Sequence, residues 1–191
     1  MIFSHTNNEQ GFTLIELIVG LVLTVIILGI AIKLLIFQRK TFNVQEQVNE
    51  MHQYIRSSMD AMSKEARMAG YNPTDAGFNG ISVAQTGTLT FRIDFDGSGT
   101  IGGTETITYA YDQANSQIDR TAGAGAQSFA ENIKNLSFSY YDSDGATTAT
   151  LSDIRKIKIT ITGRTKNIDP TYGDYKYATL TSFVTPKNLD Y

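Results

Sequence analysis

Apolar residues are gathered near one end of this chain rather than spread evenly along it. Residues 17–32 are 16 consecutive uncharged residues, and Glu16 and Lys33 are the only charged residues of the segment 12–37. At about 1.5 Å per helical residue, this segment would be about 39 Å long, enough to cross the hydrocarbon core of a bilayer. A secretory signal peptide would carry a shorter apolar region after basic residues, but residues 1–11 contain no Lys or Arg. The pattern therefore favours a retained membrane helix.

Helical patterning continues beyond the apolar segment, but on one face only. Apolar residues recur at intervals of three or four, at Val44, Val48, Met51, Ile55, Met59, Met62, Ala66 and Ala69. This spacing is typical of a single apolar stripe on an otherwise polar helix, and we expect the stripe to pack on the protein's own domain. Gly70 and Pro73 then indicate the end of the helix. The sequence predicts one helix from about Thr13 to Ala69.

After Pro73 the chain changes to short alternating runs separated by Gly, Asp and Asn. Five runs predict β-strands, over 88–95, 105–111, 135–142, 155–163 and 175–184. In the fourth run three isoleucines alternate with polar residues, which is typical of an antiparallel sheet with one packed and one solvated face. Gly123-Ala124-Gly125 predicts a loop. The predicted fold class is therefore α+β, a long N-terminal helix packed on an antiparallel β-sheet head.

Composition excludes several classes of protein. The chain of 191 residues has no Cys, two His and a formal net charge of -3. Without Cys there is no disulfide framework, thiolate metal site or Cys nucleophile. No nucleophile–base set or His cluster is visible either, which argues against an enzyme.

The charge balance also argues against a protein that coats nucleic acid, because such proteins neutralise phosphates with many Lys and Arg. One basic cluster stands in the head, at Arg155, Lys156, Lys158, Arg164 and Lys166. The solvated side of a strand explains this cluster better than DNA binding does.

One acidic segment, 94–105, has the spacing of a calcium loop. Oxygen-bearing residues stand at positions 1, 3, 5, 7 and 12 of this segment, at Asp94, Asp96, Ser98, Thr100 and Glu105. Gly97 at position 6 allows the sharp turn, and Thr100 would offer its carbonyl oxygen. Ser98 replaces the usual Asp or Asn, which weakens binding. Because strands flank the segment, a Ca²⁺-type loop in a β-hairpin and an acidic hairpin turn without metal both remain open.

Glu16 is the most informative residue of the apolar segment. A carboxylate inside a membrane helix costs about 2.5–3.5 kcal/mol on insertion scales, so a cationic partner is expected. No Lys or Arg lies within two helical turns of Glu16. The carboxylate therefore either lies at the headgroup interface or meets a cation from elsewhere, such as a new N-terminus just upstream.

The residues Gly11-Phe12-Thr13-Leu14-Ile15-Glu16 resemble the type IV prepilin motif. The resemblance implies that a prepilin peptidase cuts between Gly11 and Phe12 and that the new amine of Phe12 is methylated. It also implies that Glu16 meets the N-terminal amine of a neighbouring subunit and sets its register during filament assembly. The implied organisation is a leader (1–11), a transmembrane and filament-core helix (12–37), an amphipathic continuation (38–72) and a β-rich head (73–191).

The segment 38–73, notably Arg67-Met68-Ala69-Gly70-Tyr71, resembles the corresponding segment of PilW-type minor pilins. The resemblance implies a non-enzymatic subunit that helps to initiate a type IV pilus near its tip and serves adhesion or motility. Its expected partners are other major and minor pilins, the inner membrane and the inner-membrane assembly platform. The head would be periplasmic before assembly and part of an extracellular fibre afterwards.

Two alternatives stay open beside this resemblance. A J-type minor pseudopilin of type II secretion shares the layout, and a membrane-tethered calcium-dependent adhesin would keep residues 1–11 and need no Glu16. One feature departs from the family pattern. The leader has no basic residue, whereas Lys33, Arg39 and Lys40 follow the apolar segment, so a positive-inside count orients the chain backwards.

Overall fold

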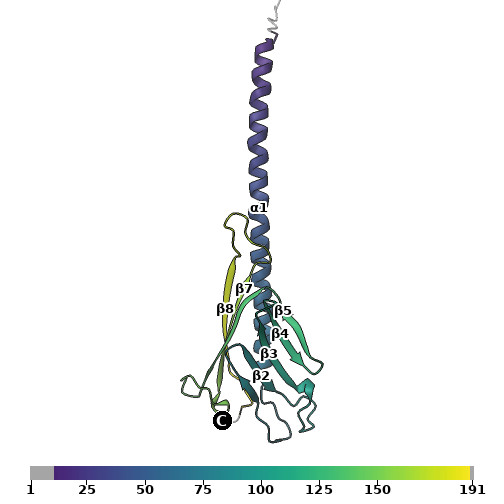
Figure 1. Cartoon of the computed structure of the whole chain (residues 1–191), viewed down its shortest axis with the longest axis vertical. Coiled ribbons are helices and arrows are strands. Elements are labelled where there is room, and N and C mark those ends of the chain that lie inside the picture. Colours follow the sequence, from purple (N-terminus) through teal and green to yellow (C-terminus); the bar gives the residue numbers. More distant parts are fainter. Residues whose placement is uncertain (1–10, 190–191) are drawn as a thin grey trace, which may run out of the picture. The chain divides into compact units, whose positions relative to one another are not determined.

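A computed structural model describes residues 11–189, so all but the last residue of the predicted leader lie outside the described residues. The described chain begins with helix α1 (Leu14–Arg67). Eight strands follow within the described residues: β1 (Ile81–Ala84), β2 (Thr88–Arg92), β3 (Thr106–Asp112), β4 (Gln117–Ala122), β5 (Ala126–Ala130), β6 (Ile133–Tyr141), β7 (Lys156–Arg164) and β8 (Tyr177–Val184) (Figure 1). Two short 3-10 helices are η1 (Gly103–Glu105) and η2 (Leu151–Asp153). The chain divides into two compact units, one ending at Val44 and the other beginning at Gln45.

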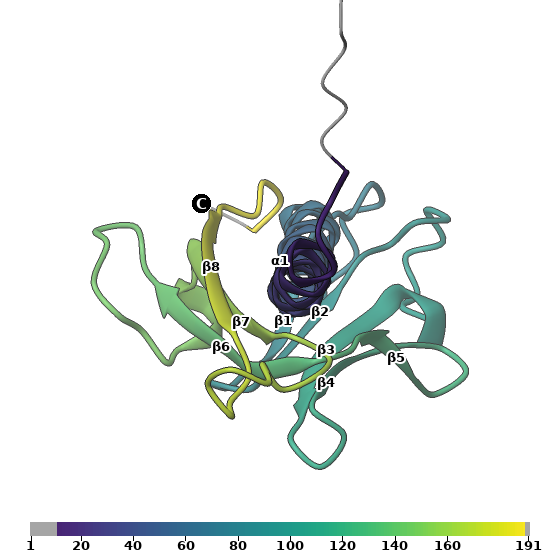
Figure 2. The same cartoon turned by 90° about the horizontal axis from the view of Figure 1, so that it is seen from above.

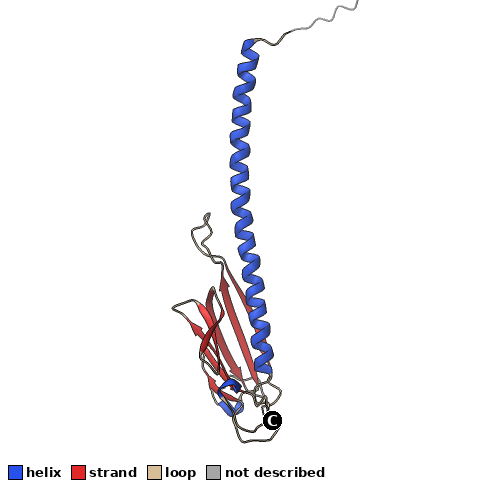
Figure 3. Cartoon of the chain, turned by 90° about the vertical axis from the view of Figure 1, so that its right-hand side faces the viewer, coloured by secondary structure: helices blue, strands red, loops and turns tan. Residues whose placement is uncertain are grey.

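The strands of the second unit form two antiparallel sheets. One sheet has the order β1-β2-β3-β4-β5 and the other the order β6-β7-β8, and every neighbouring pair is antiparallel. Within this unit the last part of α1 lies in the angle between the two sheets (Figure 2). The strands run alongside that part of the helix (Figure 3).

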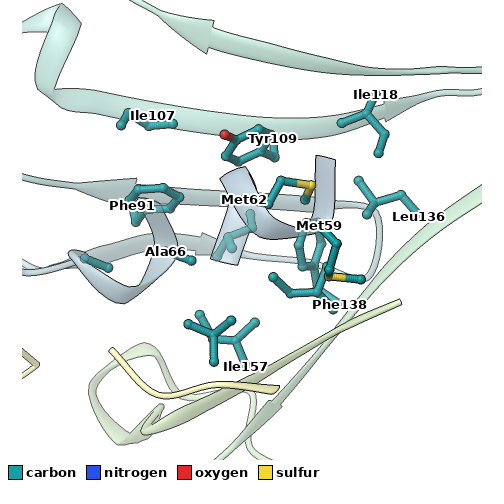
Figure 4. Packing of buried hydrophobic residues seen from close by; sticks show 14 of the residues in the cluster. Met59, Met62, Ala66, Phe91, Ile107, Tyr109, Ile118, Leu136, Phe138 and Ile157 are labelled. Carbon is teal, nitrogen blue, oxygen red and sulfur yellow. The ribbon is translucent and has the colours of Figure 1, made fainter. Parts of the chain in front are cut away.

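The predicted apolar stripe forms the helix side of the core. Its last six residues are at most 6% exposed, and they are Met51, Ile55, Met59, Met62, Ala66 and Ala69. Met59, Met62 and Ala66 lie among side chains from both sheets, including Tyr109 and Ile157 (Figure 4). The predicted α+β fold, with a long helix packed on antiparallel sheets, is confirmed.

The five predicted strands correspond to β2, β3, β6, β7 and β8, with ends shifted by a few residues. The strands β1, β4 and β5 have no counterpart among the predictions. These strands are short, and their sequences show no clear alternation of apolar and polar residues. Each buries few side chains: β4 buries only Ile118 and β5 only Ala130. Pairing with longer neighbours stabilises them instead. The predicted loop at Gly123–Gly125 is the turn between β4 and β5, where both glycines have a positive φ.

A charged contact joins α1 to the larger sheet. Arg120 of β4 donates from Nε (3.0 Å) and from a terminal nitrogen (3.1 Å) to the two carboxylate oxygens of Glu65. The hydroxyl of Tyr109 in β3 donates to Glu65 Oε2 at 2.8 Å. Burial, followed by this bond to an anion, raises the pKa of Tyr109 above its usual value. The two-pronged contact sets the position of the helix along the sheet.

The last residues of the described chain close the end of α1. Lys187 N–H donates to the carbonyl oxygen of Arg67 at 3.1 Å, one of the carbonyls that a helix end leaves unpaired. Leu189 belongs to the core cluster. Gly70 has a φ of 80°, as predicted for the residue that ends the helix, and its N–H donates to Arg92.

Candidate functional site

The predicted cleavage bond lies just before α1. Gly11 and Phe12 are exposed and precede the first helical residue, Leu14. The side chain of Phe12 is 89% exposed. A peptide bond in this position is accessible to a peptidase without unfolding of the helix.

Glu16 caps the first turn of its own helix. Its Oε2 accepts hydrogen bonds from Thr13 N–H (3.1 Å) and from Thr13 Oγ1 (2.9 Å). Glu16 N–H in turn donates to Thr13 Oγ1 at 3.4 Å. This reciprocal pattern is a capping box, which satisfies otherwise unpaired N–H groups of the first turn. In the single chain these bonds hold the carboxylate beside Thr13, the residue after Phe12.

The apolar part of α1 presents its side chains to the surroundings. All residues from 11 to 43 are exposed, and most positions from Phe12 to Phe37 hold large apolar residues. In the described chain, α1 is the one helix that is long and apolar enough to cross a membrane by length and composition. An exposed apolar surface of this extent marks a membrane or protein contact.

The predicted calcium residues lie in the loop between β2 and β3. Carboxylate oxygens of Asp94, Asp96 and Glu105 lie within 4.8 Å of one another. Asp94 is fully buried and Glu105 is 6% exposed, whereas Asp96 is exposed. Loop N–H groups bond these oxygens, from Ser98 to Asp94 Oδ1 (3.1 Å) and Asp96 Oδ1 (2.8 Å), and from Phe95 to Glu105 Oε1 (2.9 Å). Bonds from the Ser98 side chain and backbone hold the pKa of Asp96 below its usual value.

The donor set fits a hard cation such as Ca²⁺. All three carboxylates supply oxygen, the ligand atom that Ca²⁺ prefers. Each carboxylate has one oxygen that accepts a single hydrogen bond and so keeps a lone pair, and these oxygens are Asp94 Oδ1, Asp96 Oδ1 and Glu105 Oε2. Ser98 and Thr100 bond each other, from Ser98 Oγ to the Thr100 carbonyl (3.2 Å) and from Thr100 N–H to Ser98 Oγ (3.2 Å). The structure therefore brings the three predicted carboxylate ligands together.

One residue in contact with this loop was not predicted from the sequence. Thr74 Oγ1 donates to Asp94 Oδ2 at 3.3 Å from a segment 20 residues earlier in the chain. No local pattern marks Thr74, because its contact depends on the chain folding back after α1.

The basic cluster is divided by the fold. Lys156, Lys158 and Arg164 alternate along β7 with buried isoleucines and so lie on the other face of the sheet. Arg155 donates to the carbonyls of Ser152 (2.6 Å) and Ile154 (3.0 Å). The Arg164 guanidinium lies 4.7 Å from the ring centre of Tyr175. Some of these cations are thus held by local partners.

Residues 6–32 match the family described as the prokaryotic N-terminal methylation motif. The matched range includes Gly11, Phe12, Glu16 and most of the apolar segment. No curated protein matches the chain. The motif implies processing by a prepilin peptidase and assembly with other pilins, and with the exposed apolar helix it fits anchoring in the inner membrane before assembly. These findings support a type IV pilin or pseudopilin.

Proposed function

We propose that this chain is a non-enzymatic minor pilin of a type IV pilus. The observation that carries the proposal is the complete motif from Gly11 to Glu16, placed at the start of a helix whose first part has exposed apolar side chains. After cleavage at Gly11 and methylation of Phe12, the segment 12–37 holds the chain in the inner membrane. The same segment then packs against other pilins when the subunit leaves the membrane. The resemblance of 38–73 to PilW-type minor pilins supports a role in initiating the fibre near its tip.

The capping geometry supports a specific role for Glu16 in assembly. A carboxylate and an ammonium group are each costly in hydrocarbon, and pairing them reduces that cost. The N-terminal amine of a neighbouring subunit can replace the two bonds from Thr13 to Glu16 Oε2. This exchange couples the axial position of each incoming subunit to one charged contact.

The mature N-terminus tests the proposal directly. We expect mass spectrometry of the chain from its native cells to find Phe12 as the first residue, with a methyl group on its amine. Cells without prepilin peptidase are the control and should yield the uncut chain. An intact Met1 in cells with active peptidase would contradict the proposal and favour a tethered calcium-dependent binding module.

A minor pseudopilin of a type II secretion system is the second candidate, because the matched motif is compatible with either filament. Neighbouring genes separate the two candidates. A pilus retraction ATPase nearby favours the pilus, and a secretin-linked secretion operon favours the pseudopilus.

We also propose that the loop 94–105 binds Ca²⁺ through Asp94, Asp96 and Glu105, with Ser98 and Thr100 as further oxygen donors. The convergence of the three carboxylates within 4.8 Å supports this assignment. Bound Ca²⁺ would neutralise the buried charges of Asp94 and Glu105 and tie β2 to β3.

Calcium is expected to raise the melting temperature of the full chain in detergent, because a ligand that binds only the folded state stabilises it. The gain is about 2.7 kcal/mol when free Ca²⁺ exceeds its Kd 100-fold. The Asp94→Ala variant should lose the shift, whereas Asp144→Ala, in an exposed acidic turn, should keep it. Identical melting curves with Ca²⁺ and with chelator would reject the site and leave an acidic turn.

A further inference from the structure

Three of the four edge strands in the described sheets carry an irregularity. The pairing of β1, β5 and β6 with their neighbours skips one residue on the edge strand, at Ser82, Phe129 and Lys134. Such bulges twist an edge and discourage pairing with another chain. β8 is the exception, because all eight of its residues pair with β7 in unbroken register.

The outer edge of β6 is also covered by other parts of the chain. Phe138 N–H donates to the Thr86 carbonyl oxygen at 2.7 Å, and the Tyr140 carbonyl oxygen accepts from Thr148 N–H at 3.1 Å. For β8, the hydrogen bonds of the backbone found among the described residues all run to β7. No strand among residues 11–189 therefore pairs with the other edge of β8.

The register identifies which residues of β8 point their backbone groups outward. Thr165 N–H donates to the Lys176 carbonyl at 2.9 Å, so this pair is hydrogen-bonded. Hydrogen-bonded and non-hydrogen-bonded pairs alternate along an antiparallel pair of strands. Tyr177 and every second residue after it are therefore not hydrogen-bonded to β7, and their backbone N–H and C=O groups point away from it. The outward residues are Tyr177, Thr179, Thr181 and Phe183.

Side-chain contacts support this assignment. Threonine Oγ1 atoms approach each other across the ladder, at 2.9 Å between Thr162 and Thr179 and at 3.3 Å between Thr160 and Thr181. Close side chains are expected at non-hydrogen-bonded pairs. The N–H and C=O groups of four alternate residues thus form an unpaired row about 20 Å long.

β8 lacks the residues that usually protect such an edge. Its sequence YATLTSFV contains no charged residue, no Pro and no Gly. The four outward residues are all exposed to solvent, and the exposed fraction is 56% for Phe183 and 45% for Tyr177. Long, regular, uncharged edges are templates for a further strand.

We propose that β8 accepts an extended segment of a partner protein as a further antiparallel strand. A row of N–H and C=O groups that repeats every two residues matches an extended polypeptide backbone. The fitting segment lacks Pro and places β-branched or hydroxyl side chains opposite Thr179 and Thr181. This inference concerns the head alone, so it holds for a pilus, a pseudopilus or a tethered module.

A peptide with the sequence of β7, residues 156–164, is a suitable probe, because in the sheet its Thr160 and Thr162 already stand opposite Thr181 and Thr179. We expect saturable binding to the full chain in detergent micelles, measured by fluorescence anisotropy. Bound peptide should slow amide hydrogen exchange at Tyr177, Thr179, Thr181 and Phe183. A scrambled peptide should do neither.

Thr181→Pro removes one outward N–H while leaving the backbone hydrogen bonds to β7 in place, and Pro is tolerated at such edge positions. We expect a loss of about tenfold in peptide affinity, the value of one backbone hydrogen bond. Thr181→Val keeps the N–H and the side-chain shape, so it should bind as the original chain does. Equal loss in both variants would overturn strand addition, since it would assign binding to the side chain.

A second measurement leaves the protein unchanged, so it remains decisive if Thr181→Pro does not fold. Two versions of the peptide are prepared, and each is N-methylated at one of the two alternating sets of backbone amides. Strand addition requires that one of these peptides binds and the other does not. Equal binding of the two peptides, or no protection of the four outward amides, would overturn the proposal.

Discussion

Replacing Glu16 by Ala is expected to leave the chain in the membrane and to remove it from assembled filaments. Insertion becomes easier, because an apolar side chain avoids the cost of about 2.5–3.5 kcal/mol for a carboxylate in the bilayer. Assembly loses its partner for the N-terminal amine. Immunoblots of membranes and of sheared filaments measure both outcomes.

Two further variants separate charge from helix capping. Glu16→Gln keeps a hydrogen-bond acceptor for Thr13 but has no charge, so it should fail to assemble like Glu16→Ala. Thr13→Val removes the hydroxyl bond of 2.9 Å to Glu16 and keeps the carboxylate, so it should still assemble. Normal incorporation of Glu16→Ala would show that the carboxylate does not set register.

The Gly163→Val variant is expected to lower the free energy of unfolding of the head by about 2–3 kcal/mol, through overpacking. A Cβ at Gly163 would lie 2.6 Å from Ile55 Cγ2 and 3.2 Å from Met51 Cγ, where α1 packs on β7. Both neighbours are buried and have little room to move. Denaturant unfolding of the full chain in detergent measures the loss.

Gly77→Val is the matched control, because a Cβ at Gly77 would meet no atom within 4 Å. The double variant Ile55→Ala with Gly163→Val should lose less unfolding free energy than the sum of the two single variants. The smaller side chain at position 55 leaves room for the valine, and the valine fills part of the cavity that Ile55→Ala creates. Additive costs, or a Gly163→Val chain as stable as the original, would contradict the close packing of α1 on β7.

Features that depend on local spacing were accessible from the sequence. The membrane segment follows from an uninterrupted apolar run, and the buried stripe of α1 follows from the helical repeat. The three isoleucines of β7 show the two-residue period of a half-buried strand. The capping box of Thr13 and Glu16 joins residues three apart, so the motif already contains it.

Features that depend on distant partners were not accessible. The charged pair of Glu65 and Arg120 joins residues 55 apart, and neither neighbourhood shows a pattern that selects the other. The strands β1, β4 and β5 form because pairing with a neighbour offsets their weak alternation. Thr74 reaches Asp94 only after the chain turns back beyond α1.

The calcium loop and β8 lie between these cases. Sequence spacing placed five oxygen donors on one loop, but only the folded hairpin decided that three carboxylates converge. The sequence of β8 by itself determined an uncharged, regular strand. Only the tertiary structure decided that one side of this strand pairs with β7 while the other has no partner in the described part of the chain, because strand pairing joins residues that are distant in the sequence.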